Sequence, residues 1–211
     1  MKKLVLSLVA VAAFGYAANA QEKEKGAYNF EQGNIIVEGA FTISDKTTKP
    51  EGSGDEIKTT NFNFNPKAAY FLNDKFAVGV ELGFGKEQEE GVSVHYNTTY
   101  AGAFARYYFL ELGKRFKTYG EVGLGYKESK ERNVAIAEKQ TGIKAGVTVG
   151  MNYFVTPKLA IGFNLGDIFA YENYNVKEGD TKTKNVSETN AKINVFNNFF
   201  DTAKFSLTYK F

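Results

Sequence analysis

Apolar side chains recur at every second position along most of the chain, and this alternation limits what the sequence can fold into. A period of two is typical of β-strands with one apolar and one polar face. No helical period follows Lys25, so the chain is predicted to be all-β. The predicted strands cover residues 35–43, 62–72, 76–84, 96–110, 119–127, 143–155, 159–165 and 205–211.

The connections between these eight segments alternate strictly in length. Short connections lie at residues 73–74, 113–114 and 156–158, and long, charged ones at residues 44–60, 86–95, 128–141 and 173–190. In an antiparallel meander this order places every long connection at the same end. The pattern predicts an eight-stranded antiparallel up-and-down transmembrane β-barrel with short periplasmic turns and long extracellular loops.

The two faces of the strands support the same prediction. One face is apolar and has aromatic residues near the strand ends, as a lipid-facing band would. The other face is rich in Gly, Ala, Asn and Thr, and the narrow interior of an eight-stranded barrel needs such small residues. A soluble eight-stranded carrier of the lipocalin type is the rival fold, and it would carry the apolar face inside.

The first twenty residues have the three parts of a secretory signal peptide. Lys2 and Lys3 precede an apolar run over residues 4–14, and Ala18-Asn19-Ala20 is a small-x-small cleavage site. The run is shorter than the roughly 20 residues that a membrane-spanning helix needs. We expect cleavage near Ala20, a short polar lead over 21–32 and a barrel domain over 33–211, located in the outer membrane.

Composition excludes several kinds of function. The chain has no cysteine and one histidine, so thiolate metal sites, disulfides and cysteine nucleophiles are ruled out. Once Lys2 and Lys3 are removed with the signal, 24 basic residues balance 24 acidic ones. This neutrality gives no reason to expect nucleic acid as a partner. No cofactor or metal is expected.

Two segments resemble a known family. Phe205-Ser-Leu-Thr-Tyr-Lys-Phe211 resembles the last strand of bacterial outer-membrane proteins, and residues 104–109 (FARYYF) resemble a segment of small barrels of the OmpA/OmpX-like porin superfamily, of the Bacteroidetes type. The resemblance implies outer-membrane lipid as surroundings and recognition of the last strand by the barrel-assembly machinery. The implied assembly signal is Phe205, Leu207, Tyr209 and Phe211.

His95 is the one residue that suggests catalysis. It lies in the second long connection near Glu89, Glu90 and Ser93. A Ser/His/acid site needs rigid support and an oxyanion hole, and nothing here supplies either. We therefore expect a surface histidine and no catalytic residue. An outer-membrane lipid-modifying enzyme remains a remote alternative.

Five charged residues are predicted by parity to point away from the apolar face: Glu38, Lys67, Glu81, Arg106 and Glu121. An arginine on the lipid face at mid-depth costs about 2–4 kcal/mol, which assigns Arg106 to the interior. The same parity sends Phe104 and Tyr108 inward as bulky plugs. We expect one buried network, in which Arg106 pairs with Glu81 and Glu121 while Lys67 bridges Glu38 and Glu81.

The network has two readings. The preferred one is a plug that satisfies its own charges, because a buried charge needs a partner. The protein would then have a side-chain-filled lumen and a structural or surface-interaction role, with the long loops available to an extracellular ligand. The alternative is a narrow porin-like channel for ions or small solutes, in which the network is a gate.

Overall fold

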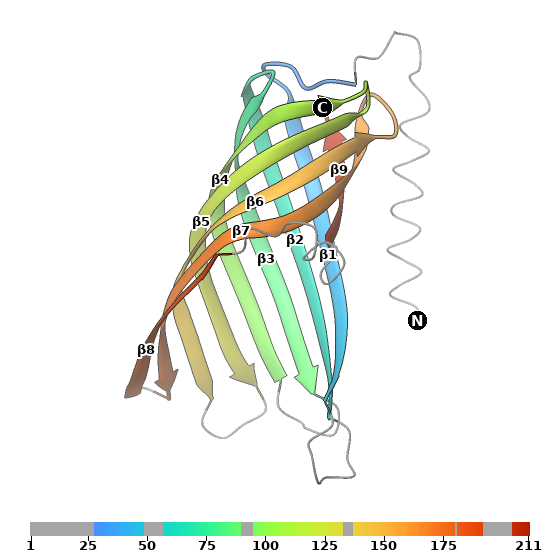
Figure 1. Cartoon of the computed structure of the whole chain (residues 1–211). Coiled ribbons are helices and arrows are strands. Elements are labelled where there is room, and N and C mark those ends of the chain that lie inside the picture. The colour runs from blue at the N-terminus through green and yellow to red at the C-terminus, as the bar shows by residue number, and fades with distance from the viewer. Residues whose placement is uncertain (1–27, 49–56, 90–94, 133–136, 180, 192–203) are drawn as a thin grey trace.

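A computed structural model describes residues 28–48, 57–89, 95–132, 137–179, 181–191 and 204–211. These residues form nine strands and one continuous antiparallel sheet (Figure 1). None of these described segments is a helix long and apolar enough to cross a membrane. The strands are β1 (Ile35–Thr48), β2 (Ile57–Asn73), β3 (Phe76–Glu89), β4 (His95–Leu112), β5 (Phe116–Arg132), β6 (Glu138–Phe154), β7 (Leu159–Glu178), β8 (Thr181–Ala191) and β9 (Lys204–Lys210).

Eight of the strands close into a ring, as the sequence predicted. Each strand from β1 to β7 pairs with the next, and β9 completes the ring by pairing with both β7 and β1. Within the ring each strand pairs with two neighbours, so the ring has no unpaired edge. The short turns gather at the end of the barrel that holds the C-terminus, and the strand ends that the long connections join lie at the other end (Figure 1).

The fourth long connection is not the loop that was predicted for residues 173–190. β7 runs on to Glu178, and β8 returns alongside it from Thr181 to Ala191 as a hairpin. These residues show no apolar alternation, because both faces of the hairpin are polar and project beyond the barrel. Cross-strand bonds hold it instead, such as the one that the Asn185 side-chain amide donates to Asn175 over 3.0 Å.

The outer surface of the ring is apolar and the inner surface polar. Val80, Leu124 and Ile43 are 60%, 59% and 63% exposed on the outside, whereas Arg106 and Glu38 are buried inside. This distribution is the reverse of that in a soluble carrier of the lipocalin type, so the rival fold is excluded. The outer surface is suited to hydrocarbon, in which only a closed ring can satisfy backbone hydrogen bonds.

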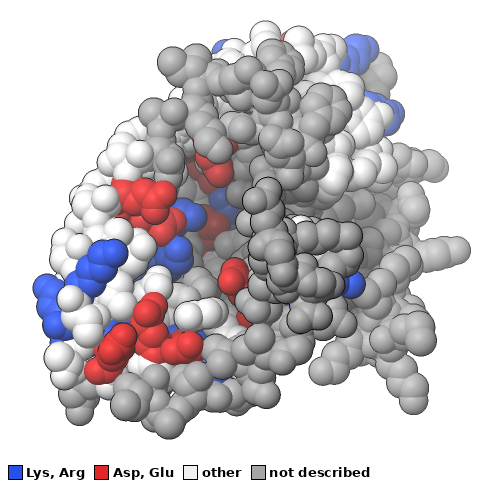
Figure 2. Space-filling model, turned by 60° about the horizontal axis from the view of Figure 1, so that its bottom comes forward, with Lys and Arg blue, Asp and Glu red and all other residues white. Residues whose placement is uncertain are grey.

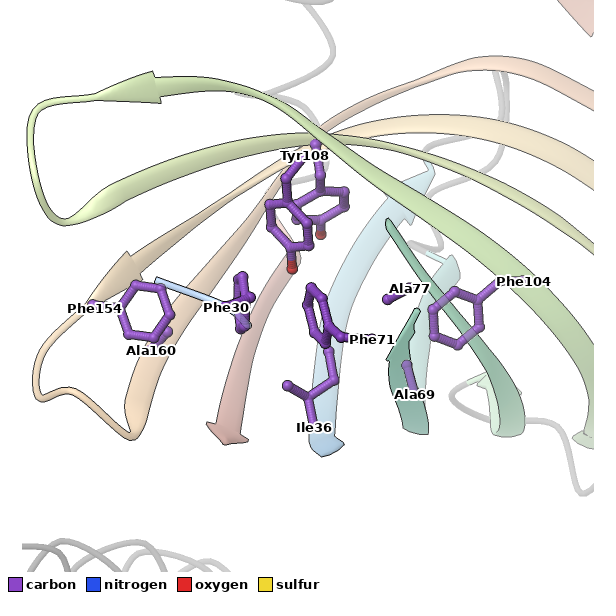
Figure 3. Close-up of a cluster of buried hydrophobic side chains, with 10 residues drawn as sticks. Phe30, Ile36, Ala69, Phe71, Ala77, Phe104, Tyr108, Phe154 and Ala160 are labelled. Carbon is purple, nitrogen blue, oxygen red and sulfur yellow. The ribbon is translucent and has the colours of Figure 1, made fainter. Parts of the chain in front are cut away.

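The apolar core is a layer of aromatic rings at the end with the short turns (Figure 3). Phe30 lies at its centre, 4.4 Å from the Phe71 ring, 4.6 Å from Tyr108 and 5.1 Å from Phe154, measured between ring centroids. Only 4% of Phe30 is exposed. The residue comes from the segment predicted as a polar lead, so the last part of that lead packs inside the mouth of the barrel.

Hydrogen bonds fix this segment to the rim of the mouth. Lys117 binds the side chain of Asn29, and the Lys210 ammonium donates to the Asn29 backbone carbonyl over 2.6 Å. The Arg115 guanidinium donates to the Tyr28 hydroxyl over 3.0 Å. Residues 28–32, which we call the N-terminal plug, are therefore held from several strands and close this end of the lumen.

Candidate functional site

The structure brings the five predicted charged residues together in the middle of the lumen. Each comes from a different strand, in order from β1 to β5. Strand register places Glu38 opposite Lys67, Lys67 opposite Glu81, and Arg106 opposite Glu121. Directly opposed side chains on one face of an antiparallel pair lie close together, so the register itself assembles most of the cluster.

Arg106 is the centre of the network and is 1% exposed. Its two terminal nitrogens donate to the two carboxylate oxygens of Glu38 over 3.0 and 3.3 Å, which is the bidentate fork geometry. Its Nε donates to Glu121 Oε2 over 2.7 Å. One guanidinium thereby neutralises carboxylates from opposite sides of the lumen.

Lys67 extends the network to the third carboxylate. Its ammonium lies 2.5 Å from Glu121 Oε1 and 3.4 Å from Glu81 Oε2. The ion pairs therefore run in the order Glu38, Arg106, Glu121, Lys67, Glu81, and every member has an opposite charge beside it. A fully satisfied network of this kind rigidifies the interior, whereas a partly satisfied one is costly.

Two predicted pairings were wrong. Lys67 was expected to bridge Glu38 and Glu81, but it binds Glu121 in place of Glu38. Arg106 was expected to bind Glu81 on the neighbouring β3, but its second partner is Glu38. Register explains the difference: Arg106 lies opposite Ala77 on β3, whereas Glu81 lies opposite Gly102, four residues along the strand. The barrel is narrow enough that a long arginine side chain reaches across the lumen more easily than along the wall.

Three further polar residues complete a closed ring of hydrogen bonds. Arg106 donates to the Tyr108 hydroxyl, Tyr108 to Asn152, Asn152 to Thr208, and Thr208 to Glu38, over 2.9–3.3 Å. Asn152 and Thr208 are both buried. Sequence reasoning missed them because uncharged residues on the polar face gave no signal. Their inward parity, on the segments that form β6 and β9, was the one available clue.

Aromatic rings enclose the cations of the network. The Arg106 guanidinium lies 4.0 Å from the centroid of the Tyr119 ring, and the Lys67 ammonium lies 5.0 Å from that of Phe104. Both distances fall within the range of a cation–π interaction. Phe104 and Tyr108 point inward, as parity predicted, and both are buried.

A cavity of about 660 Å³ occupies the lumen on the other side of the network. Its walls run from Lys86 and Tyr96, near the long connections, down to Glu38, Lys67 and Glu121. Acidic and basic side chains gather along this hollowed end (Figure 2). We call this space the vestibule. The ion network is its floor, and the aromatic layer with the N-terminal plug lies beneath that floor.

His95, the one candidate for catalysis, lies apart from the vestibule. His95 begins β4, opposite Gln88 and Arg132, and is not part of the vestibule wall. Its suggested neighbours Glu90 and Ser93 lie outside the described residues. In the part of the chain that the structure covers, no group of three or more His, Asp or Glu side chains could hold a metal ion.

A closed ring of strands with an apolar exterior and a charged, side-chain-filled interior defines a transmembrane β-barrel of the outer-membrane type. A comparison with family models agrees with the geometry. The chain belongs to the family described as the outer membrane protein beta-barrel domain, whose model matches residues 6–211. The family places the protein in the outer membrane. Short turns face the periplasm in such barrels, so the vestibule faces outward.

The chain is similar to solved structures of outer-membrane proteins at low sequence identity. The outer membrane protein OprG from Pseudomonas aeruginosa is 14% identical, with a TM-score of 0.50 over 87% of this chain and 98% of its own. The N-terminal β-barrel domain of OprF from the same organism is 16% identical, with a TM-score of 0.47 over 85% and 98%. Neisserial surface protein A is 18% identical, with a TM-score of 0.49 over 85% and 98%. No curated protein sequence matches the chain.

The predicted assembly signal forms the strand that closes the ring. Phe205 and Phe211 are exposed on the outside, and the backbone N–H of Phe211 donates to the Ile35 carbonyl over 2.9 Å. The ring of Phe211 is 64% exposed and contributes little to packing within the barrel. Any strong effect of removing it would therefore act through recognition during assembly.

Deletion of Phe211 should lower the amount of protein in the outer membrane and leave unassembled protein in the periplasm. Fractionation followed by immunoblotting measures both pools, and His95→Ala is the control that should leave them unchanged. The shortened chain, refolded in detergent, should retain nearly the stability of the parent. Normal membrane levels without Phe211 would show that the terminal aromatic residue is not the signal.

Proposed function

We propose that this protein is a non-conducting outer-membrane barrel that presents an outward-facing vestibule and long hairpins to the cell's surroundings. The proposal rests on the observation that the periplasmic half of the lumen is closed twice. The Arg106 network spans the lumen, and the N-terminal plug fills the mouth beneath it. The role is structural or one of surface interaction, and the protein is not an enzyme.

Export and assembly complete the proposal. We infer that the signal peptide is removed near Ala20, which frees the N-terminal plug, eight residues further on, to enter the barrel mouth. The partners are outer-membrane lipid around the apolar exterior, the barrel-assembly machinery during biogenesis, and an extracellular ligand. Nucleic acid is not among them.

A narrow channel is the second candidate function, and the vestibule favours it. The open part of the lumen already reaches Glu38 and Glu121, so a path needs to cross only the network and the plug. Rearrangement of the Arg106 ion pairs would then act as a gate. The two functions differ in a measurable property, which is steady conductance.

Refolded protein in planar lipid bilayers should show no steady ion conductance. The double variant Phe30→Ala with Arg106→Ala should conduct, because it removes both closures while leaving the strands in place. Tyr126→Ala, which changes a lipid-facing residue that is 52% exposed, is the matched control and should remain silent. Regular conductance steps from the parent protein would favour the channel.

A further inference from the structure

The vestibule wall carries a flat aromatic surface, the ring of Tyr100 on β4. Glycines on the neighbouring strands make room for it. A Cβ added to Gly125 would come within 2.6 Å of Tyr100 Cζ, and one added to Gly83 would come within 3.0 Å of Tyr100 Cβ. A Cβ at Gly102 would overlap the Tyr100 hydroxyl. The ring therefore lies along the wall, with one face against the backbone and the other toward the cavity that it lines.

Tyr100 differs from three other aromatic residues of the lumen, Tyr119, Phe104 and Tyr108. Tyr119 and Phe104 have cations over their rings, and Tyr108 packs in the aromatic layer. For Tyr100 the structure gives no ring stacking and no cation–π contact with any described residue. Its cavity-facing side is only half-buried and is available to a ligand.

Neutral polar side chains lie beside Tyr100, between it and the charged residues of the vestibule. Asn65 and Tyr100 lie close together over Gly83. A Cβ added to Gly83 would be 2.8 Å from the Asn65 amide nitrogen and 3.0 Å from Tyr100 Cβ. Two residues further along β3, a Cβ added to Gly85 would lie 2.6 Å from the Asn63 side-chain oxygen and 3.3 Å from Thr98 Cβ, so these two side chains also lie close together. The patch thus combines one half-buried aromatic ring with two amides and the Thr98 hydroxyl, which also bonds with the Ser129 hydroxyl over 3.0 Å.

The charges at the floor of the vestibule are already paired. Glu81 binds Lys67 and accepts a hydrogen bond from Asn65 over 3.3 Å, and Glu121 is shared by Lys67 and Arg106. A cationic ligand would have to compete for these carboxylates. A neutral ligand with many hydroxyl groups would not, because amides and hydroxyls both donate and accept hydrogen bonds.

From this geometry we propose that the vestibule binds a neutral saccharide. The C–H face of a pyranose ring stacks on Tyr100, while its hydroxyl groups bond with Asn63, Asn65 and Thr98. The cavity of about 660 Å³ lies within the size range of small-molecule sites and suits a mono- or disaccharide. The inference rests on the proposed function in one respect. The vestibule is closed at its periplasmic end, so the ligand enters from outside the cell.

Saturation-transfer NMR on the refolded mature protein tests the proposal. Maltose and lactose are the neutral probes, choline is the cationic probe, and the detergent is lauryldimethylamine oxide, which has no sugar headgroup to compete. We expect saturation of aromatic protons to reach the ring C–H protons of at least one disaccharide. Tyr100→Ala should weaken its binding about tenfold, or about 1.4 kcal/mol, whereas Tyr100→Phe, which keeps the ring, should stay close to the parent.

Tyr126→Ala, which removes a tyrosine from the lipid-facing side, is the matched control and should bind like the parent. The proposal is overturned if neither disaccharide receives saturation at tens of millimolar, if Tyr100→Ala binds as well as the parent, or if choline binds more tightly than both sugars. Conductance of the same samples separates this inference from the proposed function. If the protein neither conducts ions nor binds sugar, the saccharide inference is refuted and the proposed function stands. If it conducts ions and binds sugar, the proposed non-conducting function is refuted and the saccharide inference stands.

Discussion

Replacing Arg106 with alanine should lower the free energy of unfolding by about 3–5 kcal/mol, the usual cost of breaking a buried ion pair. The substitution leaves Glu38 with Thr208 as its remaining hydrogen-bond partner, whereas Glu121 keeps Lys67. Urea unfolding in lipid vesicles measures the loss. Arg132→Ala, at the exposed extracellular end of β5, is the matched control and should change stability little.

The pairing seen in the structure predicts which second substitution restores stability. Adding Glu38→Gln to Arg106→Ala should recover part of the loss, because the stranded carboxylate is then neutral. Adding Glu81→Gln should not, since Glu81 pairs with Lys67 and not with Arg106. Equal recovery by both glutamines would contradict the assignment of Glu38 as the main partner of Arg106.

Removing the Phe30 ring should have an effect of similar size. Truncating a fully buried phenylalanine to alanine typically costs about 3–5 kcal/mol, because the lost transfer energy is joined by the cost of the cavity. Phe30→Ala should also release residues 28–32 from the barrel mouth, since three aromatic neighbours lose their common contact. Urea unfolding reports the stability, and limited proteolysis from the periplasmic side reports the release.

Phe109→Ala provides the comparison at the same end of the barrel. That ring is 51% exposed on the outer surface, so its removal should cost less and leave the plug protected from protease. If Phe30→Ala were as stable and as resistant as the parent, the aromatic layer would not be what holds the N-terminal segment.

Much of this fold could be predicted because a membrane barrel imposes a simple rule on its sequence. Lipid on one side and a narrow lumen on the other force strict alternation, so parity alone placed Glu38, Arg106 and Glu121 inside. Alternating connection lengths then gave the topology. The same rule fails for a strand that does not lie between lipid and the lumen. β8 lies beyond the barrel with polar residues on both faces, so its sequence looked like a loop.

Two features depended on distances that a sequence does not contain. Phe30 is a single aromatic residue in a polar segment, and only the aromatic layer from β2, β4 and β6 makes it a plug. The partners of Arg106 depended on how far neighbouring strands are shifted along one another. That shift places Glu81 four residues from Arg106 and brings Glu38 within reach across the lumen.

The joining of β1 to β9 also determines the order of events in folding. Glu38 and Thr208, which face each other in this pair, are separated by 170 residues. Contacts this distant in sequence form slowly, because the entropy of closing the loop between them is lost before any contact compensates for it. The ring cannot close, nor can Glu38 accept its hydrogen bond from Thr208, until β9 is in place. Without β9, the edges of β1 and β7 stay open and Glu38 lacks its Thr208 partner, so closure of the ring is the last step of folding.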